Sequence, residues 1–281
     1  MDWLTHPIPT PDQRYLLAAI SRQQQLTKPP GSLGRLEQLA IQLAAMQSTD
    51  KPCVDKVWIS IFAADHGIAE AGVSAFPQAV TAEMVKNFVH GRAAINVLAK
   101  QHQTHLEIID VGVASSLTEL NIIHQKVALG TNNFLKQPAM TEQQLQQAMQ
   151  AGKDAISRAL AANTQLFIAG EMGIANTSAA TALAAWATGQ SVTSLVGPGT
   201  GLDAQGVSHK GQVIEAALAK HADAMTGPVQ ALACVGGLEI AALVGAYIRS
   251  AQLGIAILVD GFITTSAAIV AAKIHPEITD W

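Results

Sequence analysis

The 281-residue chain has few charged residues and no cluster of basic ones. Only 14% of its residues are charged and 49% are hydrophobic, which excludes a disordered chain and leaves ample material for a buried core. The net charge is −4 and the 17 basic residues are scattered, so neither nucleic acid nor an anionic membrane surface is indicated as a partner. The length fits one large α/β domain, alone or with a smaller helical appendage.

Cysteine is nearly absent. Cys53 and Cys234 lie far apart and match no metal-binding or redox spacing, so we predict two reduced core residues rather than a disulfide. The first residues have neither a basic region nor an apolar core, so no signal peptide is predicted.

Long uninterrupted apolar runs are also missing. Glu239 interrupts Val229–Ile248, and Asp260-Gly261 interrupts Gly254–Ala272. A charged residue at the centre of a membrane helix costs about 2.5–3.5 kcal/mol. We therefore expect two buried α/β segments in a cytoplasmic protein.

Several catalytic signatures are absent. No GxSxG elbow is present, which argues against a serine hydrolase. In Gly197–Gly201 the third glycine comes one position too early for GxGxxG, which argues against a nicotinamide-dependent oxidoreductase. Asp65 and His66 are adjacent and have no partner cluster at ligand spacing, so we predict a structural aspartate at a strand end and no metal site.

The most informative stretch is Gln165–Gly189. Its pattern predicts a strand at 166–169, a glycine-bracketed turn at 170–176 and a helix from about Thr177, with Asn176 or Thr177 as N-cap. Free amides and the positive end of the helix dipole suit an anion there. Glu171 would repel a bound phosphate, so it should face a part of the ligand that carries positive charge or an acidic proton.

Strands alternate with helices along the rest of the chain. We predict strands at 57–64, 105–111, 125–129, 191–196 and 255–259, and helices at 81–100, 141–160, 204–220, 228–249 and after 261. This alternation predicts a doubly wound α/β fold with a mostly parallel sheet and helices on both faces. Residues 1–50 have the pattern of amphipathic helices broken at 28–34, so we expect a small helical domain there and a Rossmann-like domain over 51–281.

Three further groups are candidate ligand contacts. The loop Gly197-Pro198-Gly199-Thr200-Gly201 is either a phosphate loop or only a tight turn. Lys210 is either a point charge for that phosphate or a solvated lysine. The loop that holds Ser74, Phe76 and Gln78 offers neutral hydrogen-bonding groups beside an aromatic ring, which suits a flat, weakly polar ligand.

Five segments together resemble a known family. They are KPPGSLGRLE (28–37), ADHGIAEAGVSAFPQAVT (64–81), GEMGIANTSAATAL (170–183), VGPGTGLD (196–203) and the stretch from Gly236 to Ala268. The chain resembles the nicotinate-nucleotide–dimethylbenzimidazole phosphoribosyltransferases of cobalamin biosynthesis. The resemblance implies transfer of a 5-phosphoribosyl group from nicotinate mononucleotide to dimethylbenzimidazole, without metal or cofactor, by a homodimer.

The resemblance also assigns residues. It implies that Glu171 is catalytic and that Ser74, Phe76 and Gln78 bind the azole. It implies phosphoribosyl contacts from eight residues: Gly173, Asn176, Thr177, Gly199, Thr200, Gly201, Asp203 and Lys210.

One difference from the family concerns the end of the chain. Family members continue past the position of Trp281 into a segment with a Gly-Glu-Gly motif, whose glutamate is regarded as the main catalytic base, and that segment completes the small helical domain. The expectation is therefore a truncated chain that is weakly active or inactive, with Glu171 as its catalytic carboxylate. The alternative is a non-catalytic protein of the same fold that binds nicotinate mononucleotide or an azole.

Overall fold

The computed structural model describes residues 1–281 and contains one sheet of five strands, all of them parallel. The strands are β1 (Val57–Ala64), β2 (His105–Gly112), β3 (Ile123–His124), β4 (Leu166–Met172) and β5 (Ala256–Leu258). Their order across the sheet is β3-β2-β1-β4-β5. The predicted α/β class with a parallel sheet is confirmed.

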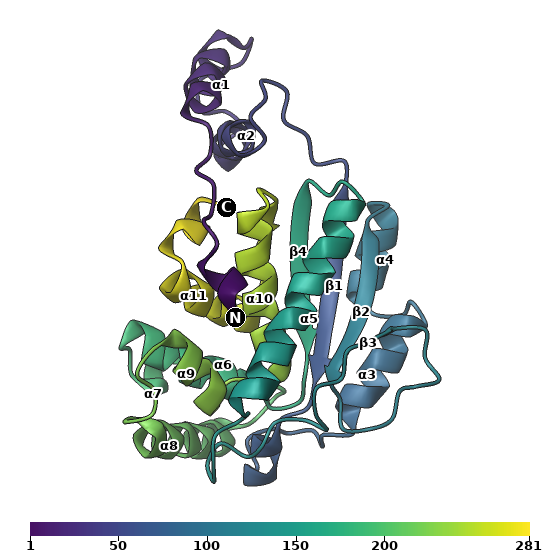
Figure 1. Ribbon diagram of the computed structural model, residues 1–281, viewed down its shortest axis with the longest axis vertical. Coiled ribbons are helices and arrows are strands. Elements are labelled where there is room, and N and C mark those ends of the chain that lie inside the picture. The colour runs from purple at the N-terminus through teal and green to yellow at the C-terminus, as the bar shows by residue number, and fades with distance from the viewer.

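Helices cover both faces of this sheet (Figure 1). The α-helices are α1 (Gln13–Gln25), α2 (Arg35–Met46), α3 (Val80–Val89), α4 (Ala94–Gln101), α5 (Glu142–Ala161), α6 (Asn176–Thr188), α7 (Val192–Leu195), α8 (Ala204–His221), α9 (Pro228–Val235), α10 (Leu238–Gln252) and α11 (Phe262–Ile274). The short 3-10 helices are η1 (Asp2–Thr5), η2 (Gly67–Ala71) and η3 (Pro276–Asp280). None of these helices is both long and apolar enough to cross a bilayer.

Alternating side chains of β1 pack into two separate hydrophobic cores, one on each face of the sheet. Trp58 and Phe62 belong to the larger core, which includes residues of α5 and α10, whereas Ile59 and Ile61 pack with residues of α3. Successive side chains of a strand point to opposite faces, so a strand covered on both faces is apolar throughout. The doubly wound arrangement therefore follows from the apolar residues on both faces of β1, where Ser60 is the single polar residue.

The strand order reverses between β1 and β4. The chain builds β1, β2 and β3 toward one edge and then returns to place β4 on the other side of β1. In open parallel sheets, ligands bind beyond the carboxyl ends of the strands at such a reversal. The ends of β1 and β4 are thus the first place to look for a site.

Helices α5 and α10 touch through glycine. A Cβ at Gly152 would overlap the carbonyl oxygen of Ala242, and a Cβ at Gly245 would overlap that of Met149. These contacts are backbone to backbone, so a side chain cannot be accommodated by a rotamer change.

We expect Gly152→Ala to lower the free energy of unfolding by about 1–3 kcal/mol, the usual cost of overpacking. Urea denaturation followed by circular dichroism measures it. Gly211→Ala on α8 is the matched control, because its new Cβ would lie 3.8 Å from the nearest atom, in Val196. An unchanged midpoint for Gly152→Ala would contradict the close-packing argument.

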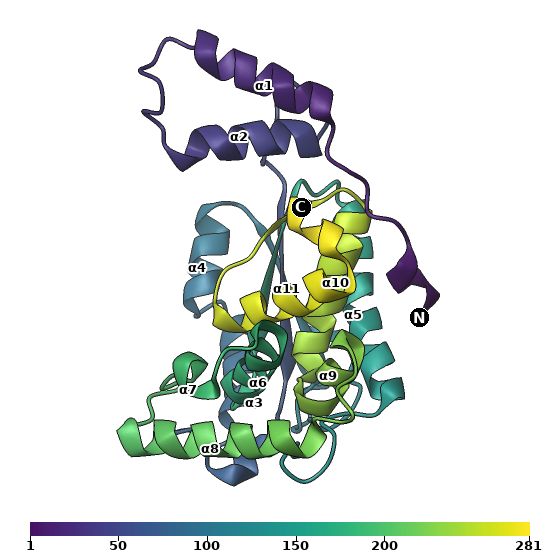
Figure 2. The same cartoon turned by 90° about the vertical axis from the view of Figure 1, so that its left-hand side faces the viewer.

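The hairpin of α1 and α2 extends beyond the amino ends of the strands, at the opposite end of the molecule from α8 (Figures 1 and 2). Lys28, in the loop between the two helices, forms a 2.6 Å ion pair with Glu37 of α2. Residues before the hairpin lie on the α/β part instead, where Gln252 Nε2 donates to the Trp3 carbonyl at 2.8 Å. The division into domains at residues 1–50 and 51–281 stays a prediction.

Two predicted strands are wrong. Residues 191–196 form the short helix α7, because the Ser191 side chain accepts from the Ser194 amide and caps a helical turn. The glycine loop at 197–201 therefore follows a helix and not a strand. The strand expected at 125–129 is also wrong, since the pairing with β2 is made by Ile123 and His124.

Two predicted helices are each divided in two. The helix expected at 81–100 is interrupted at Gly91, whose φ of 73° lies in the left-handed region. The helix expected at 228–249 is interrupted at Gly236-Gly237, both with extended backbone. Both cysteines are free, as predicted, but only Cys234 is buried and Cys53 is partly exposed.

Candidate active site

Glu171 lies at the carboxyl end of β4, at the strand reversal. It is part of the strand, where it pairs with Phe62 of β1, so the predicted boundary at residue 169 is wrong and the turn is confined to 173–175. Paired residues of parallel strands point to the same face, so Glu171 shares the face of Phe62, the one covered by α10. The strand thus presents a partly buried carboxylate at the end of the sheet.

The N-cap prediction for α6 is wrong. The N-cap position is held by Ala175, whose φ is 75°, and no side chain caps the helix. The Asn176 side chain turns back and donates through Nδ2 to Glu171 Oε2. The Thr177 hydroxyl instead accepts a hydrogen bond from Lys210 Nζ at 2.6 Å. The first two residues of α6 therefore contact a carboxylate on one side and an ammonium group on the other.

The surroundings of Glu171 favour its protonated form. Burial raises the pKa of Glu171 to about 7, the negative charge of Glu239 adds to this rise, and the Asn176 hydrogen bond opposes it. A carboxyl group with a pKa near neutrality is suited to general acid–base chemistry.

Lys210 is buried in the first half of α8 and has no carboxylate partner. Its ammonium group donates to Thr177 Oγ1 and lies 3.4 Å from the carbonyl oxygen of Gly197. Burial lowers the pKa of Lys210 to about 8. The alternative of a solvated lysine is therefore wrong, and the ammonium group is available to neutralise a bound anion.

The glycine loop passes directly over this lysine. Gly199 has a φ of 53°, and a Cβ there would lie 2.9 Å from Thr177 Oγ1 and 3.1 Å from Lys210 Nζ. Gly201 has a φ of 111°. Asp203 caps α8 by accepting from the Gly206 amide at 2.8 Å, which is a structural role for one of its oxygens.

The loop that contains the predicted azole contacts is joined to the glycine loop. The hydroxyls of Ser74 and Thr200 are 2.9 Å apart, and the Ala75 amide donates to Thr200 Oγ1 at 3.0 Å. Phe76 is 53% exposed, and Gln78 is partly exposed. The structure therefore places the residues predicted to contact the azole beside those predicted to contact the phosphoribosyl group.

Sequence reasoning missed a buried pair next to this site. His66 Nε2 donates to Glu239 Oε1 at 2.7 Å, and both side chains are fully buried. Asp65 has the structural role predicted for it, since its Oδ2 accepts from the Ala114 amide at 2.8 Å. The available signal was Glu239 itself, because a carboxylate inside an apolar helix needs a partner.

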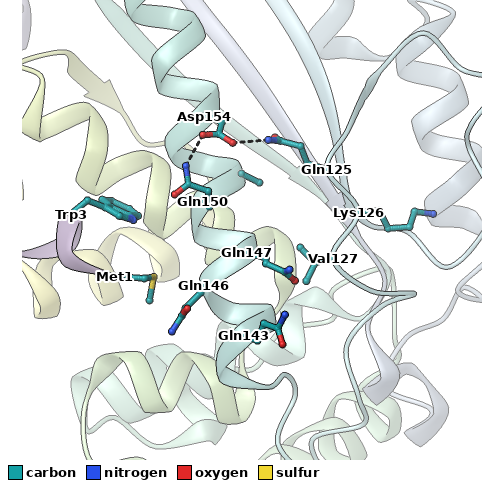
Figure 3. Close-up of a pocket in the computed structure, with 11 residues that line it drawn as sticks. Met1, Trp3, Gln125, Lys126, Val127, Gln143, Gln146, Gln147, Gln150 and Asp154 are labelled. Carbon is teal, nitrogen blue, oxygen red and sulfur yellow. Dashed lines mark hydrogen bonds between the residues drawn. The ribbon is translucent and has the colours of Figure 1, made fainter.

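A separate cavity of about 600 Å³ lies between α5 and the 125–127 segment, close to η1 (Figure 3). Glutamines dominate its lining. The carboxylate of Asp154 is already hydrogen-bonded by Gln125 at 2.8 Å and by Gln150 at 2.7 Å. None of the predicted site residues lines this cavity.

Comparisons with known proteins point to one family. A family model described as a phosphoribosyltransferase matches residues 8–281. A protein of Xanthomonas euvesicatoria pv. vesicatoria (strain 85-10), named nicotinate-nucleotide–dimethylbenzimidazole phosphoribosyltransferase, is 53% identical over 100% of this chain and 80% of its own length. A protein of the same name from Pseudomonas putida is 56% identical over 94% of this chain and 75% of its own. The crystal structure of CobT from Thermus thermophilus superimposes with a TM-score of 0.91 at 41% identity, over 95% of this chain and 80% of that one.

Proposed function

The chain belongs to the nicotinate-nucleotide–dimethylbenzimidazole phosphoribosyltransferase family, and we propose that it transfers the 5-phosphoribosyl group of nicotinate mononucleotide to 5,6-dimethylbenzimidazole. The products are nicotinate and α-ribazole 5′-phosphate, used in assembling the nucleotide loop of cobalamin. The observation that carries the proposal is the chain of contacts from Glu171 through Asn176 and Thr177 to Lys210. It places a carboxylate and an ammonium group on either side of the start of α6.

The ammonium group of Lys210 and the carboxylate of Glu171 match the opposite charges at the two ends of the substrate. Nicotinate mononucleotide carries a phosphate at one end and a cationic pyridinium on the reacting sugar carbon at the other. We assign the phosphate to Lys210, the start of α6 at Asn176-Thr177 and the Gly199–Gly201 loop, where ammonium and amide donors stabilise an anion. Gly173 and Asp203 complete the phosphoribosyl contacts in this assignment. Ser74, Phe76 and Gln78 bind the azole.

Glu171 acts as the general base in this scheme. The bond from the sugar carbon to the nicotinate nitrogen breaks, and its electron pair leaves with nicotinate, which becomes neutral at that nitrogen. One azole nitrogen forms the new bond, and the N–H proton of the other passes to Glu171. The carboxylate also stabilises the positive charge that develops on the sugar carbon.

The test is to mix the purified chain with both substrates and follow products by liquid chromatography. We expect nicotinate and α-ribazole 5′-phosphate to appear in equal amounts, and neither to form when the azole is omitted. Calorimetric binding of both substrates with no nicotinate released would instead support the non-catalytic alternative.

The rate should depend on pH in a bell-shaped manner. Glu171 must be ionised to accept a proton, so kcat/KM should fall about tenfold per pH unit below its pKa of about 7. Lys210 loses its charge above its pKa of about 8, so kcat/KM should also fall on the alkaline side. Initial rates between pH 5 and pH 10 at constant ionic strength measure both limbs. A flat profile from pH 6 to pH 8 would contradict the assignment of Glu171 as base.

The homodimer expected from the family resemblance also belongs to this proposal. Leu17, Leu33 and Leu36 on the α1–α2 hairpin are more than half exposed, which is consistent with a surface covered by a second copy. Light scattering should give twice the chain mass of 29.4 kDa. A cytoplasmic location stays a prediction.

A further inference from the structure

The buried His66–Glu239 pair has no role in the scheme above. It joins the end of β1 to the first turn of α10, and both side chains are completely shielded from solvent. His66 Nδ1 and Glu239 Oε2 have no hydrogen-bond partner. A buried ion pair adds little stability, and apolar residues of similar volume are often as stable in its place. The pair therefore calls for an explanation other than stability.

Two glycines enclose the imidazole ring. A Cβ at Gly173 would lie 3.3 Å from His66 Nε2 and would overlap the carbonyl oxygen of Ala64. A Cβ at Gly237 would overlap His66 Cε1 and would lie 2.7 Å from Glu239 Oε2. The ring thus packs directly against the turn that follows Glu171, with no side chain between them.

The charges of the pair act on Glu171. Glu239 raises the pKa of Glu171, while a protonated His66 lowers it by a smaller amount. Burial lowers the pKa of His66, but the carboxylates of Glu239, Asp65 and Glu171 together outweigh it, so His66 holds a proton more tightly than a free histidine. Asp65 from the end of β1 also faces His66, and Tyr247 from α10 faces Glu171.

We propose that His66 and Glu239 form a positioning unit that fixes the turn at Gly173, directly after β4, and thereby controls the charge on Glu171. The inference rests on the proposed function, because it needs Glu171 to exchange a proton with the substrate. His66 and Glu239 do not touch the substrate. They act through Glu171, with the imidazolium balancing one of the two carboxylates.

The test replaces Glu239 by glutamine, which keeps the shape of the side chain and removes its charge. The loss of the negative charge should lower the pKa of Glu171. We expect the acid limb of kcat/KM to move to lower pH by roughly half a unit to one unit. The infrared carboxyl band that disappears in Glu171→Gln should show the same shift of its titration midpoint, with or without turnover.

Glu215→Gln is the matched control, because Glu215 is exposed on α8 and should move neither midpoint. A Glu239→Gln protein with lower kcat but an unmoved midpoint would overturn the proposal, because a merely structural role predicts that result. If the unmodified chain releases no nicotinate, the proposed function fails, and the infrared midpoint still decides the inference.

A measurement on the unmodified chain tests the proposal even if the Glu239→Gln protein does not fold. The ring nitrogens of His66 should give imidazolium signals in nitrogen-15 NMR at pH 7. These signals should change with the midpoint of Glu171, and Glu171→Gln should remove that change. The proposal would also be overturned if His66 were neutral at pH 7 and its signals did not change as Glu171 ionises.

Discussion

Glu171→Gln is expected to reduce kcat by about 10²- to 10⁴-fold, the usual contribution of a positioned general base. The amide is nearly isosteric, and its oxygen can still accept from Asn176, so the turn should keep its shape. Only the capacity to take a proton and to stabilise a developing cation is lost. Nicotinate mononucleotide should therefore bind within about threefold of its normal affinity, because its phosphate contacts are untouched.

Initial-rate kinetics and calorimetry on the same preparation separate these two effects. Glu83→Gln is a suitable control, since Glu83 is exposed on α3 and pairs only with Lys86. The base assignment would be abandoned if Glu171→Gln turned over at the normal rate. A parallel loss of binding and turnover would indicate a collapsed turn instead.

Lys210→Met should weaken binding of nicotinate mononucleotide by about 10- to 100-fold. Hydrogen bonds to charged groups contribute roughly 1.5–3 kcal/mol, and each 1.4 kcal/mol is tenfold in affinity. Methionine keeps an unbranched side chain at this buried position but cannot neutralise a phosphate. Binding of the azole should change little, because its predicted contacts lie on the loop at 74–78.

Lys220→Met provides the comparison, because Lys220 lies exposed on the same helix and should leave affinity unchanged. Calorimetry at pH 7, where Lys210 is largely protonated, measures the difference. Unaltered affinity in Lys210→Met would remove this lysine from the phosphate site.

Sequence patterns that involve only a few neighbouring residues predicted the starts and breaks of helices well. The helix start at Thr141 is confirmed, because a side chain three residues away completes a capping box with it. The break in the helical pattern at 28–34 separates α1 from α2, as expected. By contrast, the prediction of a strand at 191–196 is wrong, since six residues are too few for their period to tell a strand from a helix.

The sequence by itself determined the α/β class, the parallel sheet and the segments that carry the candidate site. These depend on periodicity and on which residues follow each strand, and both properties are local. Only the tertiary structure decided how the site residues are connected. Ser74 meets Thr200 and His66 meets Glu239 across 126 and 173 residues, and no local pattern encodes such a pairing. Glu171 shows the difference most clearly. Its position after an apolar run can be read from the sequence. Burial and the charge of Glu239 raise its pKa, and both arise only when the chain is folded.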